Sequence, residues 1–122
     1  MTFALSNGDF LELTLAMRKQ YELEQTKPDV YKKFVTAKGR IMKSGGDLEK
    51  FSDLDAAQIV YAAYICGLED MTKAIGYMDF LDLLEDDWTD AVNAAIELMT
   101  PKKKTAFAKP SAAEPDGSAD EK

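Results

Sequence analysis

Histidine is absent from the 122 residues of this chain, and cysteine occurs once, at Cys66. Without histidine, the sequence offers no His-based catalytic triad, no histidine general base and no imidazole metal ligand. A single cysteine cannot form a disulfide within the chain, and it provides too few thiolates for a zinc or iron–sulfur site. Catalysis would have to rest on Asp, Glu, Lys or Tyr, so we expect a protein that is not an enzyme and that carries no cofactor or metal.

Long apolar runs are also missing. None approaches the ~18 residues that a membrane-spanning helix needs. The opening segment Met1–Leu5 is followed at once by Asn7-Gly8-Asp9, unlike a signal or transit peptide. We therefore expect a cytoplasmic protein without membrane contact. Cys66 ends the apolar run Ile59–Cys66 and has acidic neighbours, which predicts a buried structural thiol rather than a reactive one.

Basic residues are fewer than acidic ones, 15 against 22, which gives a formal charge of −7. Nucleic-acid binders usually present a basic face, so this balance argues against nucleic acid as a partner. The last 22 residues contain five lysines and four acids, so the acidity belongs to residues 1–100. Because residues 101–122 are also poor in apolar side chains, the sequence predicts one domain at 1–100 and a disordered tail at 101–122.

Helical spacing of apolar residues dominates the first half. Phe10, Leu13, Met17 and Tyr21 recur about one turn apart after the capping residues Ser6–Asp9, which predicts a well-buried helix from Phe10 to about Gln25. Pro28 suits the first turn of a second, basic helix that ends at Ser44-Gly45-Gly46. Its expected core positions are Val30, Phe34, Ala37 and Ile41. Thr2–Leu5 is a candidate short strand, and Leu48 and Phe51 are expected in a short helical turn.

The second half begins with a capping-box-like segment, Ser52–Asp55. The apolar face that follows, from Leu54 to Leu68, predicts a helix at the centre of the core. After a connector at Ala74–Gly76, apolar residues again follow a helical period: Tyr77, Leu81, Leu84, Trp88, Ala91, Ala95 and Met99. Asp86-Asp87 either break this run into two helices or cap the second one. The predicted fold class is therefore all-α, a single small bundle of about four to five helices with a disordered C-terminal tail.

The acids of the last helical run lie on a face of their own, at Asp79, Asp82, Asp86 and Asp90. Clustered carboxylates can bind a hard cation or share a proton, but leucines interrupt these acids at helical spacing. A face exposed to solvent or to a partner explains them better. Met71 and Met78 flank the connector, and flexible thioethers there are either core filler or an adaptable binding patch.

Two segments resemble the tail assembly chaperones of long-tailed, siphovirus-type phages, particularly those of Gram-positive hosts. The first is Tyr61-Ala62-Ala63-Tyr64-Ile65-Cys66-Gly67, and the second is Tyr77-Met78-Asp79-Phe80-Leu81-Asp82-Leu83-Leu84-Glu85-Asp86-Asp87. The short helix from Val92 to Met99 and the segment Thr100-Pro101-Lys102-Lys103-Lys104-Thr105-Ala106-Phe107 complete the likeness, which covers about residues 54–107. Many members of the family begin with a strand pair, for which this sequence gives little sign.

The resemblance implies a function. Such chaperones bind the long tape measure protein while the tail is built, keep it soluble, recruit the major tail (tube) protein and are absent from the finished virion. They would act in the host cytoplasm. Many are made in two lengths by a translational frameshift, and consecutive codons for Lys102–Lys104 suit a slippery stretch, although an ordinary basic linker explains the lysines equally well.

For this role we expect a partner-binding surface on the acidic helix, formed by Met78, Asp79, Phe80, Asp82, Leu83 and Asp86. The alternative function is an acidic nucleic-acid mimic that blocks a DNA-binding protein, and an enzyme with paired carboxylates is a third. The sequence leaves open whether the chain forms a homo-oligomer, in which the basic helix at 29–43 would pair with the acidic helix between chains rather than within one. Phe3, Leu23 and Val35 are either core residues or marks of self-association.

Overall fold

A computed structural model of the protein describes residues 1–44 and 52–100, in which five α-helices accompany one antiparallel hairpin. The strands are β1 (Thr2–Ala4) and β2 (Phe10–Glu12). The helices are α1 (Met17–Thr26), α2 (Pro28–Ser44), α3 (Asp53–Cys66), α4 (Tyr77–Leu83) and α5 (Trp88–Met99), and the short 3-10 turns are η1 (Met71–Lys73) and η2 (Glu85–Asp87). The predicted helical bundle is therefore confirmed, whereas the predicted tail at 101–122 and the turn at 48–51 lie outside the described residues.

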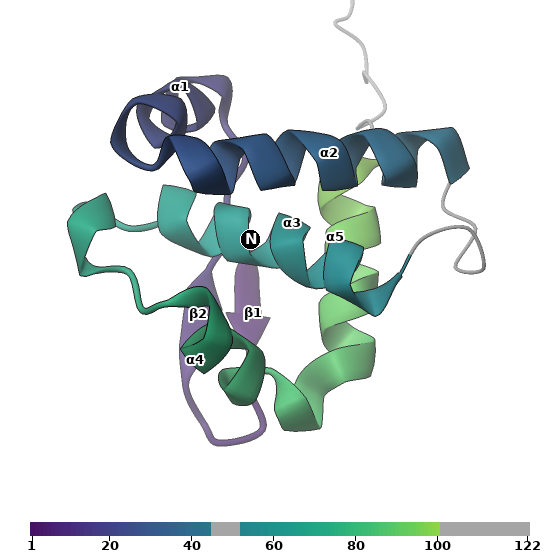
Figure 1. The fold of residues 1–122 in the computed structure, drawn as a ribbon. Coiled ribbons are helices and arrows are strands. Elements are labelled where there is room, and N and C mark those ends of the chain that lie inside the picture. The colour runs from purple at the N-terminus through teal and green to yellow at the C-terminus, as the bar shows by residue number, and fades with distance from the viewer. Residues whose placement is uncertain (45–51, 101–122) are drawn as a thin grey trace, which may run out of the picture.

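Helix α3 forms the centre of the core, as the sequence predicts. The capping box at its start is present, since the Ser52 hydroxyl accepts from the Asp55 backbone N–H and the Asp55 carboxylate accepts from that of Ser52. From Asp55 to Ala63 every residue is buried. Figure 1 shows α2 lying along α3, while α5 and the hairpin pack against α3 from other directions. A helix surrounded in this way needs apolar residues on all its faces rather than on a single stripe.

The N-terminal hairpin corrects the prediction that Phe10 begins a helix. Phe10–Glu12 instead pairs with Thr2–Ala4, with Phe3 opposite Leu11. The loop between the strands closes through Gly8, whose φ of +96° is a left-handed conformation that glycine adopts without strain. The Asn7 side chain accepts from the Asp9 backbone N–H at 2.8 Å and holds the turn. The sequence shows little sign of a strand pair beyond the candidate strand Thr2–Leu5, and the structure contains one.

Helix α1 is shorter than predicted and faces the core with different residues. Met17 and Tyr21, which were expected in the core, are 76% and 64% exposed, and the buried side chains are those of Gln20 and Leu23. The Gln20 amide donates to the Leu15 carbonyl at 2.6 Å, which satisfies one polar group of this buried side chain. Leu23 is therefore a core residue.

The remaining core predictions mostly hold. In α2 the buried residues are Phe34, Ala37 and Ile41, with Val30 packed against them at the edge. Phe3 also belongs to the core, whereas Val35 is 46% exposed.

Two contacts attach the hairpin to the helices. The buried Asp87 carboxylate accepts hydrogen bonds from the backbone N–H of Ser6, at 3.0 and 3.1 Å, and from the Ser6 hydroxyl. Gly67, just after α3, lies so close to β2 that a Cβ atom there would be 2.0 Å from the Glu12 carbonyl oxygen. Gly67 therefore allows the strand to approach the end of α3. Among residues 1–44 and 52–100, no helix combines the length and apolar character needed to cross a membrane.

Candidate functional site

Tyrosines of α3 hold the connector and α4 in place. The Tyr61 hydroxyl donates to the Ile75 carbonyl at 2.7 Å, and the Tyr64 hydroxyl accepts from the Ile75 backbone N–H at 3.2 Å. The Phe80 ring lies between them, with centroids 5.1 Å from Tyr61 and 5.0 Å from Tyr64. Burial raises the pKa of Tyr61, so its hydroxyl stays protonated as the donor of this contact. The two segments that resemble phage chaperones thus pack against each other.

Phe80 does not lie on the surface. Its side chain is fully buried among the tyrosines, so it cannot contact a partner in this structure. A phenylalanine at helical spacing from Tyr77 serves the core, and the sequence did not reveal which side of α4 faces α3. The other five predicted binding residues reach solvent: Met78 is 72% exposed, Leu83 is partly buried, and Asp79, Asp82 and Asp86 are exposed.

An apolar groove is lined in part by another residue of α4. Leu54 of α3, Leu81 of α4, Glu85 of η2 and Trp88 of α5 line a hollow of about 480 Å³. The sequence placed Leu54 in the core, but its side chain is 59% exposed. Helical periodicity cannot show that an apolar residue in the first turn projects beyond the neighbouring helices. The groove and the exposed Met78 give α3, α4 and α5 an apolar surface next to acids.

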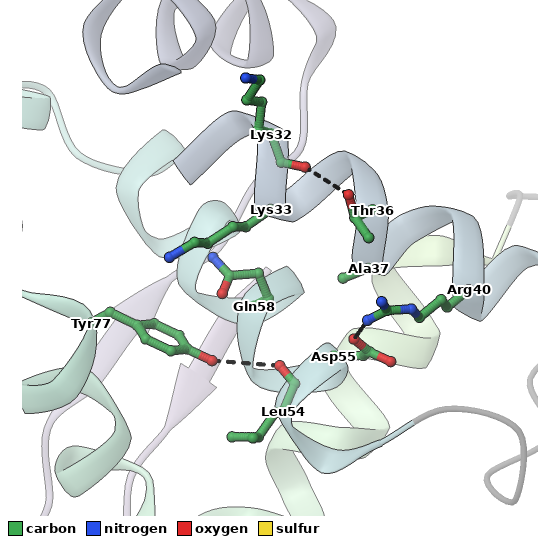
Figure 2. Close-up of a pocket in the computed structure, with 9 residues that line it drawn as sticks. All are labelled: Lys32, Lys33, Thr36, Ala37, Arg40, Leu54, Asp55, Gln58 and Tyr77. Atoms are coloured by element: carbon green, nitrogen blue, oxygen red, sulfur yellow. Dashed lines mark hydrogen bonds and ion pairs between the residues drawn. The ribbon is translucent and has the colours of Figure 1, made fainter. Parts of the chain in front are cut away.

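A second hollow, of about 360 Å³, opens between α2 and α3 (Figure 2). Lys32, Lys33 and Arg40 contribute cations, and Arg40 pairs with the buried Asp55 carboxylate at 2.8 Å. Tyr77 closes the side toward α4, where its hydroxyl lies 3.5 Å from the Leu54 carbonyl oxygen. Burial, with the Asp55 charge as a smaller cause, raises the pKa of the Tyr77 phenol. Leu54 lines both hollows, so they adjoin.

The acids that the sequence assigns to an exposed face are exposed, but they lie on three separate elements, α4, η2 and α5. Asp79, Asp82, Asp86 and Asp90 are all exposed, and within residues 1–44 and 52–100 none of them forms an ion pair with the basic helix α2. No group of three or more Cys, Asp or Glu side chains in those ranges is arranged to hold a metal ion. Cys66 is fully buried, and burial raises the pKa of its thiol to about 11, as expected of a structural cysteine.

No protein-family model, curated protein sequence or solved structure matches this chain. The likeness to phage chaperones therefore rests on the residues of the two packed segments, and the function that follows from it is a proposal.

Proposed function

We propose that this chain is a tail assembly chaperone of a long-tailed phage. In this role it binds the tape measure protein in the host cytoplasm, keeps it soluble and recruits tail tube subunits during assembly. Its binding surface consists of Met78, Asp79, Asp82, Leu83 and Asp86 together with the groove of Leu54, Leu81, Glu85 and Trp88; we call this the α4 surface.

The observation that supports this proposal is that some residues of the segment Tyr77–Asp87 pack against α3 while others face solvent. Tyr77 and Phe80 attach α4 to the tyrosines of α3, while Met78 projects into solvent three residues before Leu81, which lines the groove. A helix held firmly by one side can present its other side in a fixed geometry, which lowers the entropy cost of binding.

The chemistry of the α4 surface suits an apolar helical client. A tape measure chain exposes apolar helical segments before assembly, and an apolar groove can receive such a helix. Methionine adapts its shape to different side chains, so Met78 suits a surface that must accept several segments of one long client. The exposed acids add like charge, which keeps a loaded complex soluble.

Co-expression with the tape measure protein of the same genome tests the proposal. The wild-type chain is expected to keep the tape measure protein soluble and to co-elute with it. Met78→Ser and Leu54→Ser are expected to reduce the co-eluting fraction, because both remove exposed apolar area from the α4 surface without opening the core. Met42→Ser is the matched control, since Met42 is 56% exposed on α2 and lines neither hollow.

Two results would overturn the proposal. One is a tape measure protein that precipitates equally with and without the chain. The other is a loss of co-elution that is as large for Met42→Ser as for Met78→Ser, which would place the contact away from the α4 surface.

The gene provides an independent check. A tail assembly chaperone gene is expected directly before a very long, helix-rich open reading frame. The nucleotides encoding Lys102–Lys104 would show whether a slippery stretch is present, and mass spectrometry of the expressed products would show whether a longer form is made.

The alternative, a nucleic-acid mimic, draws on the exposure of Asp79, Asp82, Asp86 and Asp90. Mimicry predicts binding that weakens steeply with salt and depends on these carboxylates rather than on Met78. Asp82→Asn with Asp86→Asn would then abolish binding to the blocked protein, while Met78→Ser would not. A neighbouring gene for a nuclease or repressor would favour this function.

A further inference from the structure

The hollow between α2 and α3 is basic although the chain as a whole is acidic. Its lining holds three cations, Lys32, Lys33 and Arg40, against one carboxylate, that of Asp55. Arg40 and Asp55 offset each other through their 2.8 Å ion pair. In Figure 2 the ammonium group of Lys32 points away from the hollow, whereas the Lys33 chain extends past the Gln58 amide. Lys33, for which the described residues provide no ion pair, is thus the available cation.

Gln58 is the second unusual feature of this hollow. Its side chain points into the hollow (Figure 2) and only 7% of the residue is exposed, yet its amide has no hydrogen-bond partner among the described residues. Buried side-chain amides normally have partners, because leaving one unsatisfied costs about 1–3 kcal/mol. Gln20, the other buried glutamine of the described ranges, does have one. A donor amide next to a free ammonium group suits an incoming carboxylate.

The position of this hollow indicates what would carry the carboxylate. Leu54 lines both this hollow and the apolar groove of the α4 surface, whose other lining residues are Leu81, Trp88 and one acid, Glu85. A ligand that crosses Leu54 therefore meets cations in the hollow between α2 and α3, and mainly apolar side chains in the groove. An amphipathic helix has the matching pattern when an apolar stripe has acids along one flank.

We propose that the hollow lined by Lys33 and Gln58 binds a glutamate or aspartate carboxylate on the flank of a partner helix whose apolar stripe lies over Leu54, Leu81 and Trp88. This inference rests on the proposed function insofar as that function places a client helix on the α4 surface. It adds the chemistry by which such a helix is chosen and aligned: the acidic flank of the helix lies toward Lys33 of α2.

Synthetic helices test the inference with the full chain. The probe is a peptide of about 18 residues, long enough to hold helical structure, with a leucine stripe, glutamates on one flank, glutamines on the other and no tryptophan. Its matched peptide has glutamine in place of each glutamate. Trp88 is the single tryptophan of the chain and lines the groove, so its fluorescence reports binding.

The wild-type chain is expected to bind the acidic-flank peptide about fivefold more tightly than the neutral one, as one partly exposed charge-assisted contact allows. The net charge of −7 alone would favour the neutral peptide. Lys33→Gln and Gln58→Leu are expected to remove the preference, while Arg18→Gln, an equal charge change on an exposed residue of α1, is expected to keep it. If Gln58→Leu does not fold, the Lys33→Gln variant alone tests the preference. Lys33 is exposed, so this substitution leaves the core intact.

The inference is overturned if the neutral peptide binds as tightly as the acidic one, if Lys33→Gln keeps the preference, or if neither peptide binds. Its failure can be told apart from that of the proposed function. If the peptides bind without a preference but the tape measure protein still co-elutes in a Met78-dependent way, only the inference is removed. A peptide preference without any co-elution keeps the site and removes the proposed client.

Discussion

Replacing Phe80 with alanine is the sharpest test of how α4 is held. Phe80 is fully buried and contacts Tyr61 and Tyr64 at centroid distances of 5.1 and 5.0 Å. Removing a buried phenylalanine side chain costs about 3–5 kcal/mol, from lost transfer energy and from the cavity that remains. A domain of this size is stable by about 5–15 kcal/mol in total. Phe80→Ala should therefore remove a large share of the free energy of unfolding.

Urea unfolding, followed by far-ultraviolet circular dichroism and by Trp88 fluorescence, measures this cost. Met78→Ala is the matched control in the same helix, and it is expected to change the free energy of unfolding by less than about 0.5 kcal/mol because Met78 is 72% exposed. Phe80→Leu keeps most of the volume and is expected to cost about 1 kcal/mol, so it provides a measurable value if the alanine variant does not fold. A Phe80→Ala cost below about 1 kcal/mol, or one no larger than that of Met78→Ala, would refute the assignment of Phe80 to the core.

Three further predictions test other parts of the structure by urea unfolding. Gly67→Ala is expected to destabilise by about 1–3 kcal/mol because its Cβ would overlap the Glu12 carbonyl, while Gly39→Ala, in open space within α2, should stabilise by up to about 1 kcal/mol; equal effects would contradict the close approach of β2. Asp87→Ala should cost about 2 kcal/mol by leaving the Ser6 backbone N–H without its partner, and a neutral result would contradict that contact. The pKa of the Cys66 thiol is raised to about 11 from 9.0, so the unfolded chain releases this proton first and stability should fall as the pH rises from about 9 to 11; Cys66→Ala should make that fall smaller, and an unchanged pH dependence would contradict the buried thiol.

The helices that could be predicted are those whose ends are encoded locally. Pro28 begins α2, and the Ser52–Asp55 capping box begins α3. The exposed acids of α4, η2 and α5 follow from helical spacing alone. In each case a residue and its neighbours within one turn determine the outcome, so tertiary contacts do not change it.

The hairpin was missed because its residues fit two periods at once. Phe10, Leu13 and Met17 suit a helix, but Phe3, Leu5, Leu11 and Leu13 alternate inward as strands do. Asn7-Gly8, read as part of a helix start, is also a strong hairpin signal. The pairing of Phe10–Glu12 with residues six to ten positions earlier decides between the two.

The candidate site could be predicted only in part, since burial decides which residues of a helix are available. Helical spacing identified Met78 and the acids but not the side on which Phe80 lies. The basic hollow brings together Lys33 and Gln58 from two helices, and no spacing along the sequence shows that these residues meet. The structure alone indicates Gln58, because an unsatisfied amide is a property of its surroundings.

The contact between Ser6 and Asp87 has a consequence for synthesis of the protein. The two residues are 81 positions apart, and a ribosome that adds about 5–20 residues per second needs about 4–16 s to make the second after the first. Until then the hairpin loop has no carboxylate to bind, and its Ser6 N–H is left to water. Closure of the domain therefore awaits the arrival of η2, and a chain that stops before Asp87 would lack the contact that holds its N-terminal hairpin loop to the helices.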